Sequence, residues 1–125
     1  MTAATPSLRI LVDALEDIKA KDLCILNVQK QTPLYDMLII ASADSTRQVK
    51  ALAHNAKAKW KEAGGIVLGM EGEENGEWIV LDCESVIVHI MQVTIREYYN
   101  LEELWKTPSN RIALDALNQY ESSAA

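Results

Sequence analysis

The first apolar residues of the chain recur at intervals of three and four positions. This spacing places them on one face of a helix, and the residues that follow it are Leu8, Leu11, Leu15 and Ile18. Pro6 and Ser7 stand directly before the series, where a helix commonly begins. The pattern then changes to two short apolar runs with β-branched residues, 23–28 and 35–42. We therefore predict an amphipathic helix followed by two strands.

The longest predicted helix covers residues 45–63. Ser45 followed by Gln48 fits a capping box at its start, and Gly64 with Gly65 supplies a stop. At about 100° per residue its apolar positions fall in one arc, which contains Val49, Leu52, Ala53, Ala56, Trp60 and Ala63. A separate basic arc contains Arg47, Lys50, His54, Lys57 and Lys61. We expect the apolar arc to pack on a sheet and the basic arc to face outward.

The second half of the chain begins with three apolar runs of strand length. They lie at 66–71, 78–82 and 86–91. Asn75 and Gly76 separate the first two runs, and this dipeptide is a strong signal for a hairpin turn. A short helix over 94–99 and a turn over 101–105 are expected to follow. The order of elements predicts an α+β fold, with helices flanking a small mixed sheet of about five strands.

The length of the chain, 125 residues and 13.9 kDa, suits one domain with a single core. We assign residues 1–106 to this domain. Residues 107–125 are a C-terminal extension with one weak amphipathic pattern, and we expect a weak helix or partial disorder there. No apolar run approaches the roughly 20 residues of a membrane helix, and the N-terminus lacks the features of a secretory signal. We therefore expect a cytoplasmic protein that makes no membrane contact, with Cys24 and Cys83 reduced and buried.

Charge is unevenly distributed along the sequence. The 12 basic and 18 acidic residues give a net charge of −6, which argues against wholesale coating of nucleic acid. Residues 47–61 contain five basic residues and no acidic one, whereas residues 71–84 contain six acidic residues and no basic one. The basic arc is either a solvated face or a dock for phosphate or an acidic partner.

No motif in the sequence supports catalysis. Both common glycine-rich phosphate loops are absent, and so is a serine in a nucleophile-elbow context. The histidines and cysteines lack the short spacing of metal ligands, and Asp36 and Asp82 stand alone on different strands rather than as an Asp-x-Asp pair. We favour a structural role for Asp36. We expect no enzymatic activity, no cofactor and no metal.

The predicted meander over 78–91 offers a candidate binding surface. Strand alternation puts Trp78, Val80 and Asp82 on one side of their strand, and His89 and Met91 alternate in the same way on the next strand. If the register brings these residues together, their face resembles the core of a protein interface. A covering helix is the alternative, and the pattern does not decide between the two.

Six segments in order resemble the ribosomal silencing factor family, also called Iojap. They are YDMLIIAS at 35–42, STRQV at 45–49, MEG at 70–72, WIVLD at 78–82, VIVH at 86–89 and REYYNLEELW at 96–105. The resemblance covers residues 8–105. It implies a nucleotidyltransferase-like fold without the metal-binding acids. It also implies a translation repressor that binds the large ribosomal subunit through that subunit's ribosomal protein fourteen and blocks joining of the small subunit.

The resemblance also implies where a partner would bind. Trp78, Asp82 and His89 match the family's signature segment, with Trp78 as a buried anchor and Asp82 meeting basic side chains. Weaker candidates are Val80, Met91, Arg96, Tyr98 and Tyr99. Asp36 and Arg47 match family positions too, where an ion pair between strand and helix would explain them.

Two departures and three alternatives stay open. The family commonly has Gly where Ala43 and Glu84 stand, so we expect both turns to be built without positive φ. A degenerate nucleotidyltransferase-like enzyme or nucleotide-binding domain is the alternative function, which metal-dependent nucleotide binding would support. Contact of the basic arc with ribosomal RNA and self-association as a homodimer are further uses of the surface.

Overall fold

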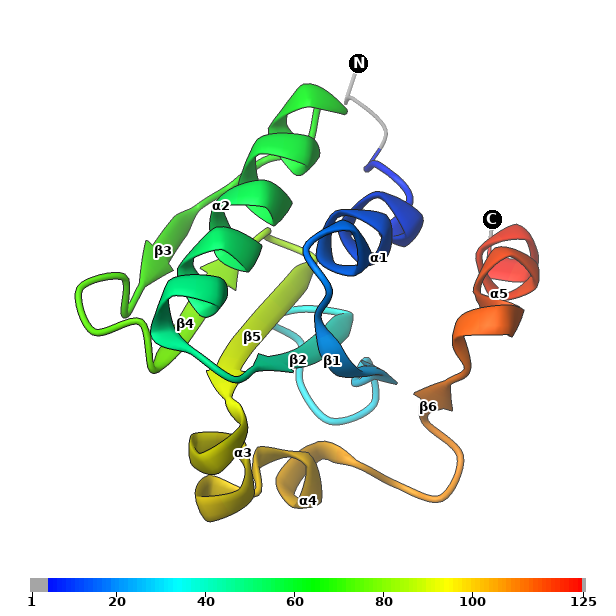
Figure 1. Cartoon of the computed structure of the whole chain (residues 1–125). Helices are drawn as coiled ribbons and strands as arrows, with labels where there is room; N and C mark the ends of the chain where they lie inside the picture. Colours follow the sequence, from blue (N-terminus) through cyan, green and yellow to red (C-terminus); the bar gives the residue numbers. More distant parts are fainter. Residues whose placement is uncertain (1–4, 125) are drawn as a thin grey trace.

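The computed structural model describes residues 5–124 and follows the predicted order of elements (Figure 1). The helices are α1 (Leu8–Asp17), α2 (Thr46–Glu62), α3 (Val93–Tyr99), α4 (Leu101–Trp105) and α5 (Leu117–Ala124), with a 3-10 turn at Leu114–Ala116. The strands are β1 (Lys21–Asn27), β2 (Met37–Ala43), β3 (Gly69–Glu71), β4 (Trp78–Asp82), β5 (Val86–Gln92) and β6 (Arg111–Ile112). None of the described helices is long and apolar enough to cross a membrane.

The strands form one mixed sheet in the order β3-β4-β5-β2-β1-β6. The central pair, β2 and β5, is parallel, and the other neighbouring pairs are antiparallel. The α+β prediction is confirmed, with one strand more than the five expected. The sixth strand has only two residues, which pair with Ile25 and Leu26 of β1. So short a strand has no alternating pattern that a sequence could reveal.

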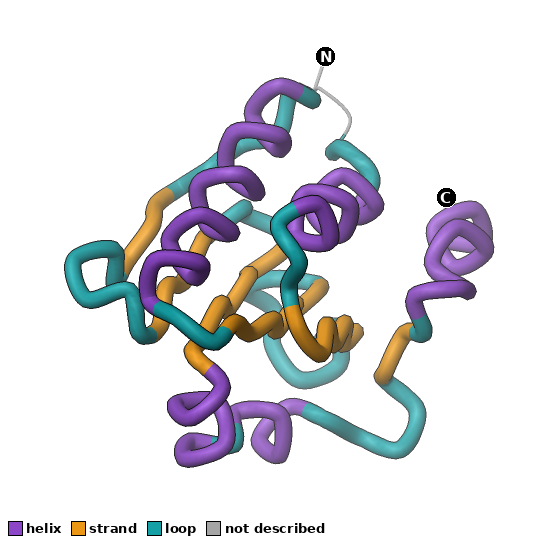
Figure 2. Tube along the Cα trace, viewed as in Figure 1, coloured by secondary structure: helices purple, strands orange, loops and turns teal. Residues whose placement is uncertain are grey.

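Helices α1 and α2 lie side by side on one face of the sheet (Figure 2). The predicted apolar arc of α2 packs there, with Val49, Leu52, Ala53, Ala56 and Trp60 buried. Ser45 caps the helix by accepting a hydrogen bond from the Gln48 N–H at 3.1 Å. The Gln48 side chain does not return to the cap as a capping box requires, because its amide donates to the Ile18 carbonyl at 2.9 Å.

The opposite face of the sheet is only partly covered. Helices α3 and α4 fold back onto it after β5 (Figure 1). They enclose a second apolar cluster built on Cys24, Leu26, Val28, Leu38, Ile40, Met91 and Leu101. Cys24 thus lies in one cluster and Cys83 in the other, and both are buried free thiols as predicted.

Residues 107–124 run back along the molecule and place α5 beside α1 (Figure 1). Leu117 is fully buried in the main core. The Glu121 carboxylate accepts a hydrogen bond from the Leu8 N–H at 2.8 Å, at the start of α1. The segment predicted as an extension therefore contributes a strand and a helix to the packed molecule. The outer ends of the two assigned segments, residues 1–4 and 125, lie outside the described residues.

One of the two turn predictions is wrong. Glu84 has φ +71°, so this turn uses the left-handed backbone that a glycine would adopt, with a glutamate in its place. A side chain compensates, because the Asp82 carboxylate accepts a hydrogen bond from the Glu84 N–H at 3.0 Å. Ala43 ends strand β2 without positive φ, as predicted.

Candidate functional site

The register of β4 and β5 brings the predicted surface residues together. Trp78 pairs with Met91 and Val80 pairs with His89. Glu71 of β3 pairs with Val80 from the other side, so a carboxylate, a valine and an imidazole form one row across three strands. These side chains lie on the face of the sheet that carries α3 and α4, at the end of the sheet nearer β3.

A hydrogen bond joins the His89 ring of this row to the Trp78 ring of the neighbouring row. The Trp78 indole N–H donates to His89 Nδ1 at 2.9 Å, and the ring centroids are 5.8 Å apart. Burial lowers the pKa of His89 to about 4, so the imidazole is neutral at pH 7. Because Nδ1 accepts, the neutral ring carries its hydrogen on Nε2. The hydrogen bond to the neutral His89 ring therefore fixes the orientation of the Trp78 indole.

Two tyrosines of α3 extend the aromatic surface outward. The Tyr99 ring lies 5.2 Å from the Trp78 ring, and the Tyr98 ring lies 5.0 Å from that of Tyr99. Tyr98 is 81% exposed and Tyr99 is 55% exposed, which is unusual for large aromatic side chains. We call the surface formed by Trp78, Val80, His89, Tyr98 and Tyr99 the aromatic face.

Two predicted surface residues lie elsewhere. Met91 is fully buried under α3 and α4, so it supports the aromatic face from below and offers no surface. The Arg96 guanidinium turns inward, where Nε donates to Glu102 at 2.8 Å and Nη1 donates to Ser42 at 3.0 Å. The hydrogen bond from Arg96 to Glu102 is the main reason why the pKa of Glu102 lies below its usual value. Met91 therefore offers no surface to a partner, and the Arg96 guanidinium is engaged in hydrogen bonds within the molecule.

Acidic side chains border the aromatic face. Asp82 lies one row beyond Val80, opposite Ile87, and the exposed Glu71 pairs with Val80. The acidic turn between β3 and β4 also reaches the basic arc of α2, because His54 Nε2 lies 3.0 Å from a Glu73 carboxylate oxygen. The basic arc is therefore partly neutralised at its middle, whereas the border of the aromatic face is acidic.

The sequence pattern missed exposed leucines. Leu104 in α4 is 76% exposed and Leu34, in the loop before β2, is 79% exposed. Leu104 belongs to the REYYNLEELW segment, where the sequence predicted a turn over 101–105 and no role for its leucines. Only Leu101 of that helix is buried. The distinction depends on how α4 lies against the sheet, which local spacing does not encode.

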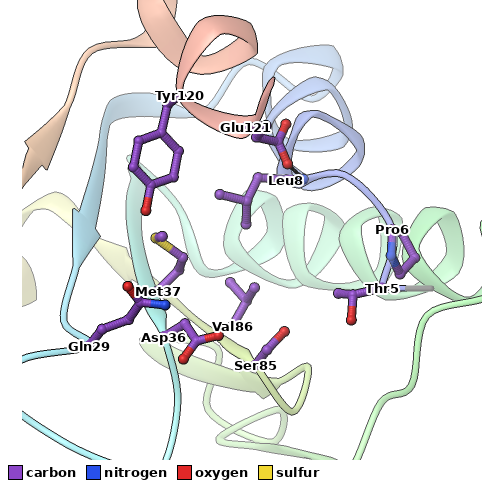
Figure 3. A pocket seen from close by; sticks show the side chains of 10 residues that line it. All are labelled: Thr5, Pro6, Leu8, Gln29, Asp36, Met37, Ser85, Val86, Tyr120 and Glu121. Atoms are coloured by element: carbon purple, nitrogen blue, oxygen red, sulfur yellow. Dashed lines mark hydrogen bonds between the residues drawn. The ribbon is translucent and has the colours of Figure 1, made fainter. Parts of the chain in front are cut away.

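A cavity of about 430 Å³ lies at the other end of β2 and β5 (Figure 3). Asp36 and Ser85 line it from the starts of these strands, while Tyr120 and Glu121 reach it from α5. The Asp36 N–H donates to the Ser85 carbonyl at 2.8 Å, but this bond uses the backbone alone, so a structural role for the Asp36 carboxylate stays a prediction. Among the described residues, the predicted ion pair between Asp36 and Arg47 is not formed, and both side chains are exposed.

The chain is similar to known proteins over nearly its whole length. The family described as "Ribosomal silencing factor during starvation" matches residues 2–125. The ribosomal silencing factor RsfS of Chromobacterium violaceum is 42% identical over 114 residues, covering 91% of this chain and 93% of that protein. The factor of the same name from Haemophilus influenzae is 40% identical over 95 residues, covering 76% and 93%. A crystal structure of a C. violaceum protein has a TM-score of 0.77 at 45% identity, covering 84% of this chain and 89% of that one. The chain belongs to the family of ribosomal silencing factors.

Proposed function

We propose that this protein binds the large ribosomal subunit through its aromatic face and thereby blocks joining of the small subunit. Membership in the family makes a ribosome-associated regulator of translation the class to test. The observation that carries the proposal is the aromatic face itself. It presents exposed tyrosines next to a tryptophan fixed by a hydrogen bond, and such rigid aromatic groups dominate the energy of protein interfaces.

The acidic border indicates the charge of the partner. Asp82 and Glu71 border the aromatic face, so a cationic protein surface complements it. Ribosomal protein fourteen of the large subunit, which the sequence resemblance implies, is the partner we propose. Charge complementarity of this kind mainly raises the association rate. That rate should fall as salt is added.

Co-sedimentation with separated ribosomal subunits tests the proposal. The protein should migrate with the large subunit and not with the small one. Tyr98→Ala removes an exposed ring, and Asp82→Asn removes a charge but keeps the acceptor for the Glu84 N–H. Each should raise the apparent Kd by about tenfold. Leu68→Ala, a change at an exposed leucine just before β3, is the matched control and should bind normally.

Light scattering on mixing the two subunits tests the second half of the proposal. The wild-type protein should lower the yield of joined ribosomes, and Tyr98→Ala should lower it less at equal concentration. Migration of wild type with neither subunit would refute the proposed function. Normal binding by both Tyr98→Ala and Asp82→Asn would refute the assignment of the aromatic face. Loss of binding on charge reversal at Lys50 and Lys57 would place the contact on the basic arc instead.

A further inference from the structure

Helices α3 and α4 carry exposed apolar side chains but little packing of their own. They have seven and five residues, and helices this short are not stable in isolation. No residue of α3 is buried, and Leu101 is the buried residue of α4. Yet these two helices present Tyr98, Tyr99 and Leu104 to solvent. Something other than their own helical stability must set their orientation.

A buried polar network fastens the two helices to the sheet. The Arg96 side chain is 11% exposed and that of Glu102 is 25% exposed. The guanidinium joins α3 to α4 through Glu102 at 2.8 Å and α3 to β2 through Ser42 at 3.0 Å. Ser42 itself is 1% exposed, and its hydroxyl donates to the Lys21 carbonyl of β1 at 3.2 Å. The Arg96 side chain thus connects both helices to β2, and Ser42 extends the connection to β1.

The joint between the helices makes this fastening necessary. Asn100 ends α3 and begins α4 in the left-handed conformation, with φ +48° and ψ +50°. Its N–H donates to the Arg96 carbonyl at 2.9 Å. A single residue in this conformation fixes the turn locally but does not hold either helix on the sheet. The bonds of the Arg96 guanidinium supply that constraint, together with the packing of Ile95, Leu101 and Trp105.

We propose that Arg96, Glu102 and Ser42 are positioning residues, which hold α3 and α4 so that the tyrosines of the aromatic face stand against Trp78 in the orientation that a partner recognises. The inference rests on the proposed function and adds determinants of affinity that do not touch the partner. It also explains why the REYYNLEELW segment contains an arginine and a glutamate whose charged groups face inward. The lowered pKa of Glu102 agrees with this, because the carboxylate is held in its charged form by Arg96.

Three variants separate positioning from contact. Arg96→Met removes both hydrogen bonds and keeps an apolar stem, Arg96→Lys keeps one cationic donor, and Glu102→Gln removes the carboxylate charge. Glu97→Gln is the matched control, since Glu97 is an exposed acid in the same helix. Two measurements are made on each folded variant: the nuclear Overhauser effect between the Trp78 and Tyr99 rings, and the apparent Kd for the large subunit.

Arg96→Met should lose the Trp78–Tyr99 signal while signals within the main core persist. Its apparent Kd should rise by about tenfold, as expected when about a tenth of the molecules hold the competent orientation. Arg96→Lys should recover part of the ring signal and part of the affinity. Glu102→Gln should give values between those of Arg96→Met and wild type, and Glu97→Gln should match wild type. Loss of binding with an unchanged Trp78–Tyr99 signal would overturn the inference, because it would make Arg96 a contact. A lost signal with normal binding would overturn it as well. If wild type itself fails to bind the subunit, the proposed function fails, and the ring signal still decides whether Arg96 orders the aromatic face.

Discussion

Acidification should destabilise the protein through His89. The neutral ring accepts the Trp78 hydrogen bond, and burial lowers its pKa to about 4, compared with 6.5 for an ordinary histidine. Below pH 6.5 His89 binds a proton in the unfolded chain, whereas in the folded chain it stays neutral until the pH approaches 4. The free energy of unfolding therefore falls as the pH falls. The loss should reach about 2 kcal/mol at pH 5 and about 3 kcal/mol below pH 4, where both states are protonated.

Urea unfolding at several pH values between 7 and 4.5 measures this loss. Other groups also titrate in this range, so the informative quantity is the difference between wild type and His89→Asn. The asparagine amide oxygen replaces Nδ1 as the acceptor for Trp78 and does not titrate. Parallel curves for wild type and His89→Asn from pH 7 to 5 would refute the reasoning.

Two stability changes follow from the turn after β4 and from the C-terminal segment. Glu84→Gly should raise the free energy of unfolding by about 1 kcal/mol, because glycine adopts the positive φ without strain. Glu84→Ala should show no such gain. Equal urea midpoints for the two variants would contradict this. Leu117→Ala should lower the free energy of unfolding by about 3 kcal/mol, since the side chain is fully buried. Thermal unfolding followed by circular dichroism tests the second change, and an unaltered Tm would mean that residues 107–124 pack independently of the domain.

The elements that the sequence predicted well are those with local signals. Helix α2 has a serine cap, a regular apolar arc and two terminal glycines, and its start and end agree with the prediction within a residue. The sequence left the register of β4 and β5 open, and the structure pairs Trp78 with Met91 and Val80 with His89 across a short turn. Once a turn that short is given, the register of two antiparallel strands has few alternatives.

The parts that could not be predicted depend on contacts between distant segments. Arg96 and Met91 stand in motifs that suggested a surface, but α3 and α4 fold back over the sheet and bury both side chains. The presence of an arginine in the sequence does not show whether the fold will place a carboxylate partner, such as Glu102, beside it. Glu84 shows a different, local limit, because the acceptor that Asp82 provides two residues earlier allows a glutamate where the backbone favours glycine.

The pairing of β6 with β1 also has a consequence for the order in which the chain folds. Ile25 pairs with Ile112, so the outermost strand joins the sheet across 86 intervening residues. The Leu8 N–H at the start of α1 donates its hydrogen bond to the Glu121 carboxylate, across a still longer separation. Contacts between positions so far apart in sequence cost more loop-closure entropy than the hairpins of the sheet, so they form late in folding.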